Sequence, residues 1–491
     1  MSFYGLEIAK TGLFISQRAI NVAGHNIANA NTAGYTRQRV ISEAIDPATL
    51  VTRFGTAANG TVGGGAQVQS LEQVRDSFLD KELRREYGDG SMWSTRTDAL
   101  EYIETMFDET DSSSLSKSLA GFFQAVLEFS NEPDSEEIRT NLRQSGITLT
   151  DTFHNFYEQL TEMRKTQNDS VASAVLSAND ILDNIAAYNK SIAGYELSGE
   201  KANDLRDKRN VQLDELSKLV DIEYNYDSNG YLNVSVGGTT LLSHTTVTHL
   251  ETVTNPTTGM YDVVLEGTAT PLNFTSGELA AYVQMRDGAS ADNIGIPYLL
   301  NGLNTLAQSL AKEMNAVHSA GWTRATTSTA SVSGINLFEV PSNDYSLITA
   351  GNFSISDEVL ASVNNLAASD TQIVLSSTNP QAGNNKTALA LSALCSAQNL
   401  ANVSSFQGYL KGFIVEIAIE SAHAQTMFES QTAVVQNLET RRESVSGVSV
   451  DEEMVNLIKS QQMYAASSRI ITAIDESLDI LINRTGIVGR G

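Results

Sequence analysis

The sequence predicts an α+β fold: an elongated out-and-back rod with coiled-coil-like helical termini, a helical bundle and a central antiparallel β module. Apolar and small residues step by three and four at both ends of the chain, and a period of two appears only in the middle. Helices at both ends with strands between them place the two termini together at one end of the rod.

A narrow stripe predicts the first helix. Its members follow one another at alternating steps of three and four: Leu6, Ala9, Leu13, Ser16, Ile20, Ala23 and Ile27. This spacing is typical of a coiled-coil seam rather than of the broad apolar face of a globular helix.

A helix stop and a turn are predicted directly after this stripe, within HNIANANTAGYTRQRV. The side chains of Asn29 and Asn31 can bond back to the local backbone, and Gly34 accepts a positive φ freely. We expect Tyr35 to anchor the chain that follows.

The middle of the chain changes its period twice. Helical spacing from about residue 99 to 220, with breaks at NEPDSE and near Gly199, predicts an elongated helical region. From Asp221 the segments YLNVSV, TTVTHL and YDVVL alternate around the turns DSNG, VGGTT and NPTTG, which indicates antiparallel hairpins. Helical spacing returns at 277–321, and Ser/Thr/Asn-rich strands and loops are expected up to about Lys386.

Two helices joined by a short bend are predicted at the C-terminal end. A long helix from about Ser404 to Glu443 is interrupted by SVSGVSV, and Ser449 with Glu452 forms a capping box, so the last helix begins near Val450. This last helix carries a second seam at steps of three and four: Leu457, Ser460, Tyr464, Ser467, Ile471, Ile474, Leu478 and Leu481.

These patterns predict three domains. Residues 1–45 with 450–491 are expected to form a terminal coiled-coil domain that is disordered in the monomer. Residues 46–220 with 277–320 and 390–449 are expected to form the helical rod, and residues 221–276 with 321–389 a β-rich outer domain.

Composition restricts the class of protein. The 491 residues are 41% hydrophobic, enough for real cores, and the net charge of −26 makes nucleic acid and anionic membrane surfaces poor partners. Cys395 is the only cysteine, which excludes an internal disulfide. We expect neither a cleaved signal peptide nor a membrane span.

No pattern of residues predicts catalysis, a cofactor or a metal site. His244 and His249 are five residues apart in an expected strand and would point to opposite faces. The spacing of Gly194 and Gly199 suggests a phosphate loop, but Glu200 follows where lysine is needed. We therefore expect the protein not to be an enzyme.

Several motifs resemble one family. The segment from Ala28 to Arg37 is similar to a signature shared by the axial proteins of the bacterial flagellum, which often have proline where Ala33 stands. Within that group, five segments in this order resemble the hook-associated protein 1 family, and the similarity runs along essentially the whole chain: GYTRQ, ELSGEKANDLRDKRNVQLDELSKLVDI, GELAAYVQMRDG, LNTLAQSLAKEMNAVHSAG and SGVSVDEEMVNLIKSQQMYAASSRIITAIDESLDILIN.

The resemblance implies a structural junction protein without enzyme activity or cofactor. It implies one ring of subunits between hook and filament, with the hook protein and a second hook-associated junction protein as neighbours. It also implies export in the unfolded state through the flagellar type III system to an extracellular place on the flagellum. We expect a cytoplasmic flagellar export chaperone to bind the C-terminal helix, whose apolar stripe suits helix-in-groove recognition.

The seams are expected to need neighbours, because a narrow stripe with many small residues buries little in one chain. In a tubular assembly the terminal helices of many subunits would pack side by side. The residues expected at this assembly interface lie on the two seams and in the turn: Leu6, Leu13, Ile20, Ile27, Asn29, Asn31, Gly34, Tyr35, Leu457, Tyr464, Ile471, Ile474, Leu478 and Leu481.

Two alternatives remain. The chain could be another flagellar axial protein, of the hook or the rod, although the long helical stretch at 99–220 and the NDLRDKRN segment argue against this. It could also be a surface adhesin or glycan-binding protein whose β module sits on a helical stalk. Glycan binding by the isolated residues of about 221–390 would favour the latter.

The seams give a first prediction. In a dilute monomer, Met1 to Arg39 and Met454 to Gly491 should be disordered because their partners are missing, and limited proteolysis should remove both ends quickly. Uniform protection of both ends would contradict this.

Overall fold

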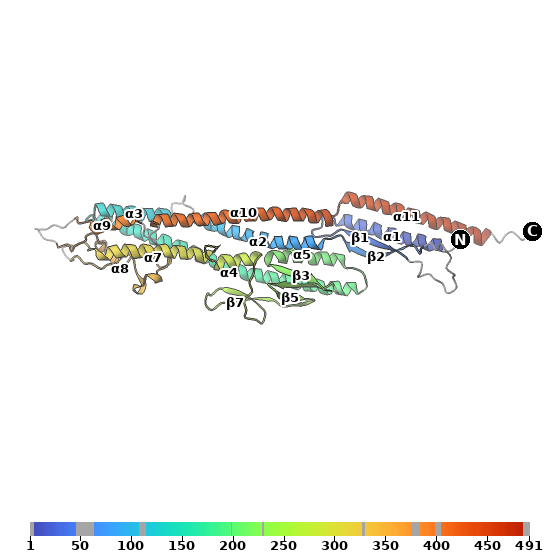
Figure 1. Ribbon diagram of the computed structural model, residues 1–491, viewed down its shortest axis with the longest axis horizontal. Helices are drawn as coiled ribbons and strands as arrows, with labels where there is room; N and C mark the ends of the chain where they lie inside the picture. The colour runs from blue at the N-terminus through green and yellow to red at the C-terminus, as the bar shows by residue number, and fades with distance from the viewer. Residues whose placement is uncertain are drawn as a thin grey trace, which may run out of the picture.

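The chain forms a long, thin rod with both termini at the same end, as the sequence predicts (Figure 1). The structure is a computed structural model, and it describes residues 4–45, 63–107, 114–197, 199–227, 230–326, 329–374, 383–397 and 404–484. Long helices and small antiparallel sheets make the predicted α+β class correct.

The longer helices follow the chain out along the rod and back. They are α1 Tyr4–Ala28, α2 Ser77–Met106, α3 Leu115–Asn131, α4 Glu136–Glu196, α5 Asn203–Leu219, α6 Glu278–Asp287, α7 Ile296–Ala320, α9 Lys386–Leu394, α10 Phe406–Ser446 and α11 Val450–Asp479.

The strands are short and all pair antiparallel. They are β1 Gln38–Ala44, β2 Ala66–Gln73, β3 Ile222–Tyr226, β4 Leu232–Val236, β5 Thr239–Ser243, β6 Thr246–Val247, β7 Leu250–Thr254, β8 Tyr261–Leu265, β9 Ala289–Ser290 and β10 Asn293–Ile294.

Polar caps fix where the helices of the rod begin. The break predicted at NEPDSE separates α3 from the 61-residue α4, and Ser135 accepts a hydrogen bond from the amide of Ile138 in the first turn of α4. Asp76 caps α2 in the same way, so this helix begins at Ser77 rather than near residue 99 as expected. On the return, α10 runs along α2 at the upper edge of the rod (Figure 1).

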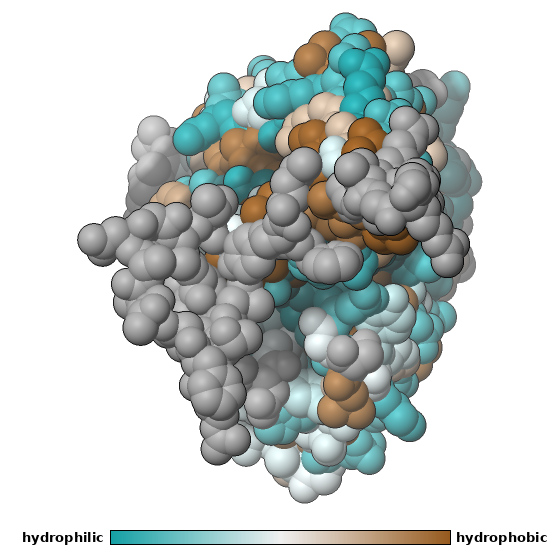
Figure 2. Space-filling view, turned by 90° about the vertical axis from the view of Figure 1, so that its right-hand side faces the viewer, coloured by the Kyte–Doolittle hydropathy of each residue, from teal (hydrophilic) through white to brown (hydrophobic). Residues whose placement is uncertain are grey.

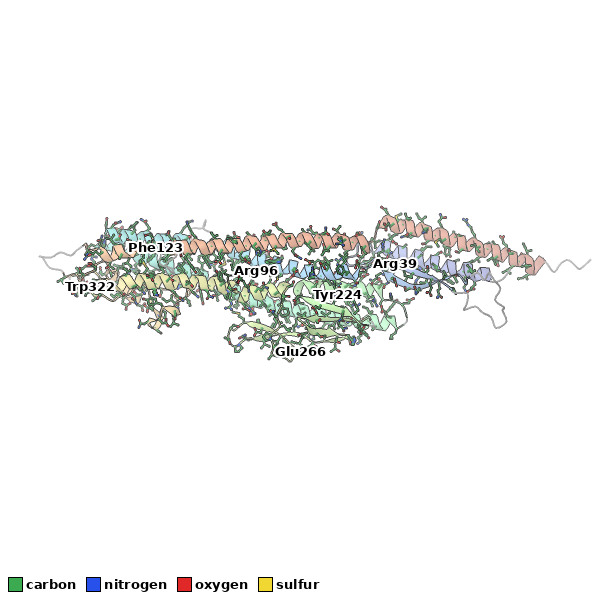
Figure 3. The ribbon with its side chains drawn as sticks, in the orientation of Figure 1. Arg39, Arg96, Phe123, Tyr224, Glu266 and Trp322 are labelled. Carbon is green, nitrogen blue, oxygen red and sulfur yellow. The ribbon has the colours of Figure 1, made fainter. Side chains whose placement is uncertain are left out.

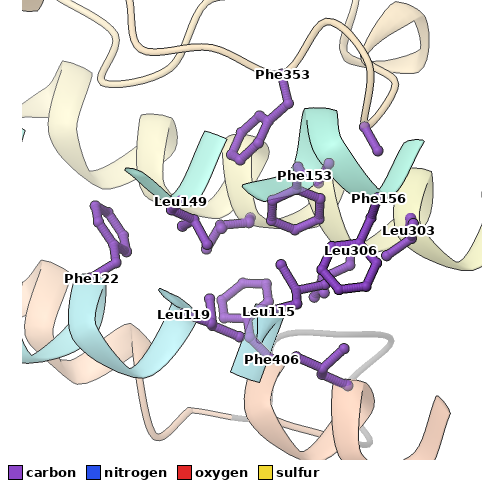
Figure 4. Packing of buried hydrophobic residues seen from close by; sticks show 14 of the residues in the cluster. Leu115, Leu119, Phe122, Leu149, Phe153, Phe156, Leu303, Leu306, Phe353 and Phe406 are labelled. Atoms are coloured by element: carbon purple, nitrogen blue, oxygen red, sulfur yellow. The ribbon is translucent and has the colours of Figure 1, made fainter. Parts of the chain in front are cut away.

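Two large hydrophobic cores lie one after the other along the described part of the rod, and a third, small cluster joins Leu79, Leu83 and Leu438. The core away from the termini joins α3, α4, α7 and α10, and in it the rings of Phe153 and Phe353 meet edge to face at 5.2 Å (Figure 4). The other core lies between the second half of α4, α5, α6 and the central strands. Each core is only a few helices wide, so the rod has little interior.

The hairpins predicted at 221–276 are present beside α4 and α5 (Figure 1). Strands β3 to β6 form one sheet in chain order, and β7 pairs with β8. Glycines with positive φ occupy the predicted turns: Gly230, Gly237, Gly238 and Gly259.

The segment expected to share a domain with these hairpins, residues 321–389, lies elsewhere. Residues 329–374 and 383–389 do not join the central strands but pack on α7 at the opposite end of the rod, in the first core. They contain isolated bridges, short 3₁₀ helices and the five-residue α8 Asp357–Ala361 instead of sheets. The prediction that 321–389 shares one β-rich domain with 221–276 is therefore wrong.

Polar side chains of α7 bond to the backbone of this segment in place of the expected sheet. Asn315 is fully buried; its Oδ1 accepts from the amides of Leu337 (2.9 Å) and Phe338 (2.8 Å), and its Nδ2 donates to the carbonyl of Phe338 (2.9 Å). Four side chains along this face of α7 make such hydrogen bonds to backbone groups of this segment, and each is called a rung below: Asn304, Gln308, Asn315 and His318. They satisfy the backbone of this segment, which needs no neighbouring strand.

A second difference concerns the domain boundary near the termini. Strands β1 and β2 pair with each other and lie against α1, so residues 63–75 pack with the terminal helices, although Gln73 also bonds to Asp207 of α5. Residues 1–3 and 485–491 of the expected terminal domain lie outside the described residues. No helix in the part of the chain described here has both the length and the apolar character needed to cross a bilayer.

Candidate assembly interface

The two seams meet within one chain, where α1 and α11 form an antiparallel pair. A Cβ atom added at Gly5 would lie 3.5 Å from Ile474 Cδ1, and one added at Gly12 would lie 3.0 Å from Ser467 Oγ. The Asn26 amide donates to Glu453 Oε2 at 3.0 Å, which continues the same antiparallel register. Small residues spaced by seven thus allow the two helices to approach closely.

The seam residues predicted on α11 largely face α1. All but the last are half-buried on the side of the helix that carries Ser467: Leu457, Tyr464, Ile471, Ile474 and Leu478. Leu481, in the last described turn, is exposed.

On α1 the predicted stripe lies beside the row of Gly5 and Gly12. Its large members are half-buried: Leu6, Leu13, Ile20 and Ile27. Within one chain, the seam of α11 therefore packs against α1.

A second apolar face of α11 is uncovered. Val455, Ile458 and Ile470 are 64%, 52% and 51% exposed; helical spacing places Val455 and Ile458 on the side away from α1 and Ile470 at the flank of the seam. Figure 2 looks along the rod from the end that carries the termini, and apolar residues lie among polar ones in its upper half, at the height of α11. Aliphatic side chains exposed along several helical turns mark a surface for another helix.

Asn26 ties α1 to both neighbouring elements. It is fully buried; its Nδ2 donates to the Gln38 carbonyl (2.9 Å) as well as to Glu453, and its Oδ1 accepts from the Gln38 amide (3.1 Å). The hydroxyl of Tyr35 also donates to Asn26 Oδ1 at 2.7 Å. One side chain thus connects α1, the start of β1 and the start of α11.

The turn after α1 has the predicted form. Asn29 Nδ2 donates to the His25 carbonyl at 3.0 Å, and Gly34 has φ of +76°. A Cβ at Gly34 would also lie 2.2 Å from Val211 Cγ2 of α5, so glycine is needed for space as well as for conformation. Asn31 is exposed.

Tyr35 anchors the turn, as expected. Its ring meets the His25 ring at a centroid distance of 5.6 Å. Burial raises the pKa of its hydroxyl, and the carboxylates of Asp204, Asp207 and Glu453 act in the same direction. The hydroxyl is therefore a neutral hydrogen-bond donor.

The NDLRDKRN segment at the start of α5 clamps this turn to the rod. Asp207 Oδ2 accepts from the amide of Thr36 at 3.1 Å, and its Oδ1 accepts from Gln73 Nε2 at 2.7 Å. Asp204 Oδ1 accepts from Gln38 Nε2 at 2.9 Å. Burial raises the pKa of Asp207 to about 6, although the hydrogen bonds from Thr36 lower it.

The bend between α10 and α11 is held from the same side. The amide of Arg37 donates to the carbonyl of Ser446 at 2.9 Å, and its guanidinium pairs with Glu452 at 3.0 Å. The oxygen of Ser449 caps α11 at the amide of Glu452, as predicted, but the Glu452 side chain reaches Arg37 instead of closing the capping box. A polar cleft of about 650 Å³ lies between the turn, α5 and this bend.

Asp214 joins three helices just beyond the bend. Its Oδ1 accepts from Arg84 Nε of α2 at 2.7 Å, and its Oδ2 from Arg442 Nη1 of α10 at 2.9 Å. Burial lowers the pKa of Arg84, but Asp214 together with Tyr224, Tyr226 and Asp80 raises it by more. The Arg84 guanidinium also lies 4.7 Å from the ring of Tyr224, which Figure 3 labels beside α5.

Sequence reasoning missed Asn26 and the acidic residues of α5. The available signal for Asn26 was its place in a row of small residues spaced by seven: Gly5, Gly12, Ala19 and Asn26. Asp204 and Asp207 lie in a segment noted only for its resemblance. Nothing in the local pattern shows that their partners lie in the turn after α1.

Among the described residues, no cluster of three or more His, Cys, Asp and Glu side chains could hold a metal ion. His244 and His249 contact different carboxylates, Asp227 at 2.8 Å and Asp183 at 3.1 Å.

Comparison with protein families gives matches at the centre and at both ends. Residues 100–338 match the flagellar hook-associated protein FlgK helical domain, residues 440–484 the flagellar basal body rod FlgEFG protein C-terminal family, and residues 6–36 the flagella basal body rod protein family.

Similar curated proteins cover the whole chain. Flagellar hook-associated protein 1 of Bacillus subtilis is 30% identical over 100% of this chain and 99% of that protein. The protein of the same name from Salmonella typhimurium is 24% identical over 97% and 98% of the two chains. The structure of the flagellar hook junction protein FlgK from Burkholderia pseudomallei has the same fold, with a TM-score of 0.61 at 15% identity, over 74% of this chain and all of that one.

The bridge at Asp214 gives a test of the rod near the bend. Asp214→Asn leaves the Arg84 side chain, 3% exposed, without its carboxylate, and should lower the free energy of unfolding by about 3–5 kcal/mol in chemical denaturation. Glu215→Gln, one residue later, removes an exposed pair with Lys218 and should cost under about 1 kcal/mol. Equal effects of the two substitutions would show that Asp214 is not a structural bridge.

Proposed function

The chain belongs to the flagellar hook-associated protein 1 family, and from this we propose that it is a structural adaptor at the junction of the flagellar hook and the filament. Its role is to carry contacts between other subunits, not to catalyse a reaction. The observation that carries this proposal is the uncovered apolar face of α11 at the end of the rod where both termini lie.

We propose that this face and the edges of the two seams form the assembly interface. The pair of α1 and α11 covers only one side of each helix and leaves Val455, Ile458 and Ile470 exposed. A ring of copies would cover them through a head-to-tail contact in which each subunit offers a different surface to each neighbour. The hook protein and a second hook-associated junction protein are the proposed neighbours along the axis.

We propose export in the unfolded state through the flagellar type III system, without a cleaved signal peptide, to an extracellular place on the flagellum. Two properties of the chain suit this route. A single cysteine leaves no disulfide to form or break. The terminal domain joins the first and last helices, so it forms only after both ends have been delivered.

We propose that a cytoplasmic flagellar export chaperone covers α11 before export. An unpaired α11 would expose both its α1-facing seam and its outer face, including Leu457, Tyr464 and Ile470. Helix-in-groove recognition suits such a helix.

The assembly interface is tested on the outer face of α11. In Ile458→Asp with Ile470→Asp, each carboxylate would be buried unpaired against a neighbour, at a cost of several kcal/mol in the assembly and little in the free chain. Cells carrying the double variant should export flagellin but retain few filaments, and motility in soft agar should be lost. The melting transition of the purified rod should not change.

A matched control lies on the same helix. Ser468→Asp with Thr472→Asp places two charges in the exposed sector that already carries Asp475 and Asp479, and motility should stay near normal. Normal filaments in the variant with aspartate at 458 and 470 would count against the outer face as an interface. An equal loss of motility in both double variants would also count against it.

The chaperone is tested by truncation. Deleting residues 451–491 should abolish binding of the cognate flagellar export chaperone to the unassembled chain, measured by calorimetry with the two purified proteins. Unchanged affinity would place the chaperone site elsewhere.

A further inference from the structure

His318 is the fourth rung on α7 and the only one that titrates. It is fully buried, and its Nδ1 lies 2.7 Å from the carbonyl oxygen of Ile335. Its Nε2 lies 2.9 Å from the amide of Ala367. A carbonyl only accepts and an amide only donates, so Nδ1 carries the proton and Nε2 is the acceptor.

The His318 ring bonds two segments at the end of the rod away from the termini, which is called the tip below. Ile335 precedes the part of the chain that Asn315 holds, and Ala367 begins a second part that pairs with the chain around Trp322. The amide of Trp322 donates to the carbonyl of Ser369 at 2.7 Å, and Figure 3 labels Trp322 at the end of the rod away from the termini. Loss of the bond to Ala367 therefore loosens the contact between these segments.

The charges around His318 oppose a second positive charge. Arg139 of α4 is also buried, and its guanidinium donates to the carbonyls of Val363 (3.2 Å) and Leu366 (2.7 Å), in the segment that reaches His318 at Ala367. Three backbone carbonyls, including that of Pro133, accept hydrogen bonds from this guanidinium.

The remaining charged groups on the surrounding segments do not cancel this charge: Asp134, whose carboxylate acts on Arg139, is an exposed residue. Arg324 adds another positive charge near Arg139. The carboxylates of Glu339 and Asp370 are on exposed residues, and Asp370 pairs with Lys386 at 3.0 Å. An imidazolium at position 318 would thus be buried beside a cation, with its Nε2–H directed at the Ala367 N–H.

We propose that His318 is an acid-sensitive latch: the neutral ring holds the 335–340 and 363–370 segments on α7, and its protonation releases them while the helices of the rod stay folded. The other three rungs, Asn304, Gln308 and Asn315, do not titrate and set the position of the segments at every pH.

The direction of the pH dependence follows from the shift. Burial lowers the pKa of His318 from its ordinary 6.5 to about 4. The closed tip therefore binds fewer protons than the open one, so its stability is complete above pH 6.5 and is lost as the pH falls toward 4. The ratio of open to closed tip should rise about tenfold per pH unit in this window, to about a hundredfold by pH 4.

The test uses the full chain with Trp93→Phe, so that Trp322 is the only tryptophan. Trp322 fluorescence should change between pH 6.5 and 4, while far-UV circular dichroism keeps the helical signal of the rod. His318→Gln retains an acceptor and a donor but no titration, and should remove the change in this window. His244→Gln replaces an exposed histidine of the β module and should leave the change in Trp322 fluorescence as in the parent.

Three results would overturn the latch. They are a parent protein whose Trp322 signal is constant down to pH 4, a His318→Gln variant with the parent's transition, and a helical signal lost together with that of Trp322. If the glutamine variant has an open tip at pH 7.5, the imidazole resonances of the parent decide alone. His318 must then titrate at the same pH at which Trp322 responds, and separate midpoints would reject the proposal.

Discussion

Buried asparagine side chains that pair with a single residue of extended backbone hold this thin rod together. Asn26 bonds both the amide and the carbonyl of Gln38. Three more asparagines on long helices make the same two bonds, each to one residue: the buried Asn189 to Leu232 and Asn315 to Phe338, and the half-buried Asn179 to Leu250. A carboxamide has the donor and acceptor of a peptide group, so it can take the place of a neighbouring strand. A rod only a few helices wide has little interior for packing, and these bonds attach its non-helical segments to the helices at four places.

Charged side chains near the bend between α10 and α11 also attach neighbouring elements of this thin rod to each other. Arginine and aspartate side chains from α2, α5 and α10 meet at Asp214, and Asp204 and Asp207 bond the turn after α1. Arg84 and Asp207 are buried, and such buried charged groups fix direction more than they add stability. The terminal helix pair is therefore held at a defined angle to the rod by hydrogen bonds, although its own contacts involve many small residues.

Local pattern was enough to predict much of this fold. The two seams, the hairpin turns with Gly230 and Gly259, and the cap at Ser449 were predicted because their signals lie within a few residues of each other. The tip at 321–389 was predicted incorrectly because its backbone is satisfied by α7, and a Ser/Thr/Asn-rich sequence looks the same whether its partner is a strand or a side chain. Asn26 was missed for a related reason, since a buried polar residue on a helix resembles an exposed one until its distant partners are known. Whether the predicted interface residues contact a second subunit remains a prediction.

The pairing of α1 with α11 also sets the order in which the molecule can fold. Synthesis makes α1 first, but Gly12 meets Ser467 and Asn26 meets Glu453 only after nearly all of the chain exists. Closing a loop of this length costs conformational entropy. The contacts between α1 and α11, which involve small residues, must offset this cost late in folding. The hydrophobic cores of the rod can form earlier from segments that are closer in sequence, and by folding they bring the two ends near each other. The first helix to be made is thus among the last to find its place, and its register depends on a rod that is already complete.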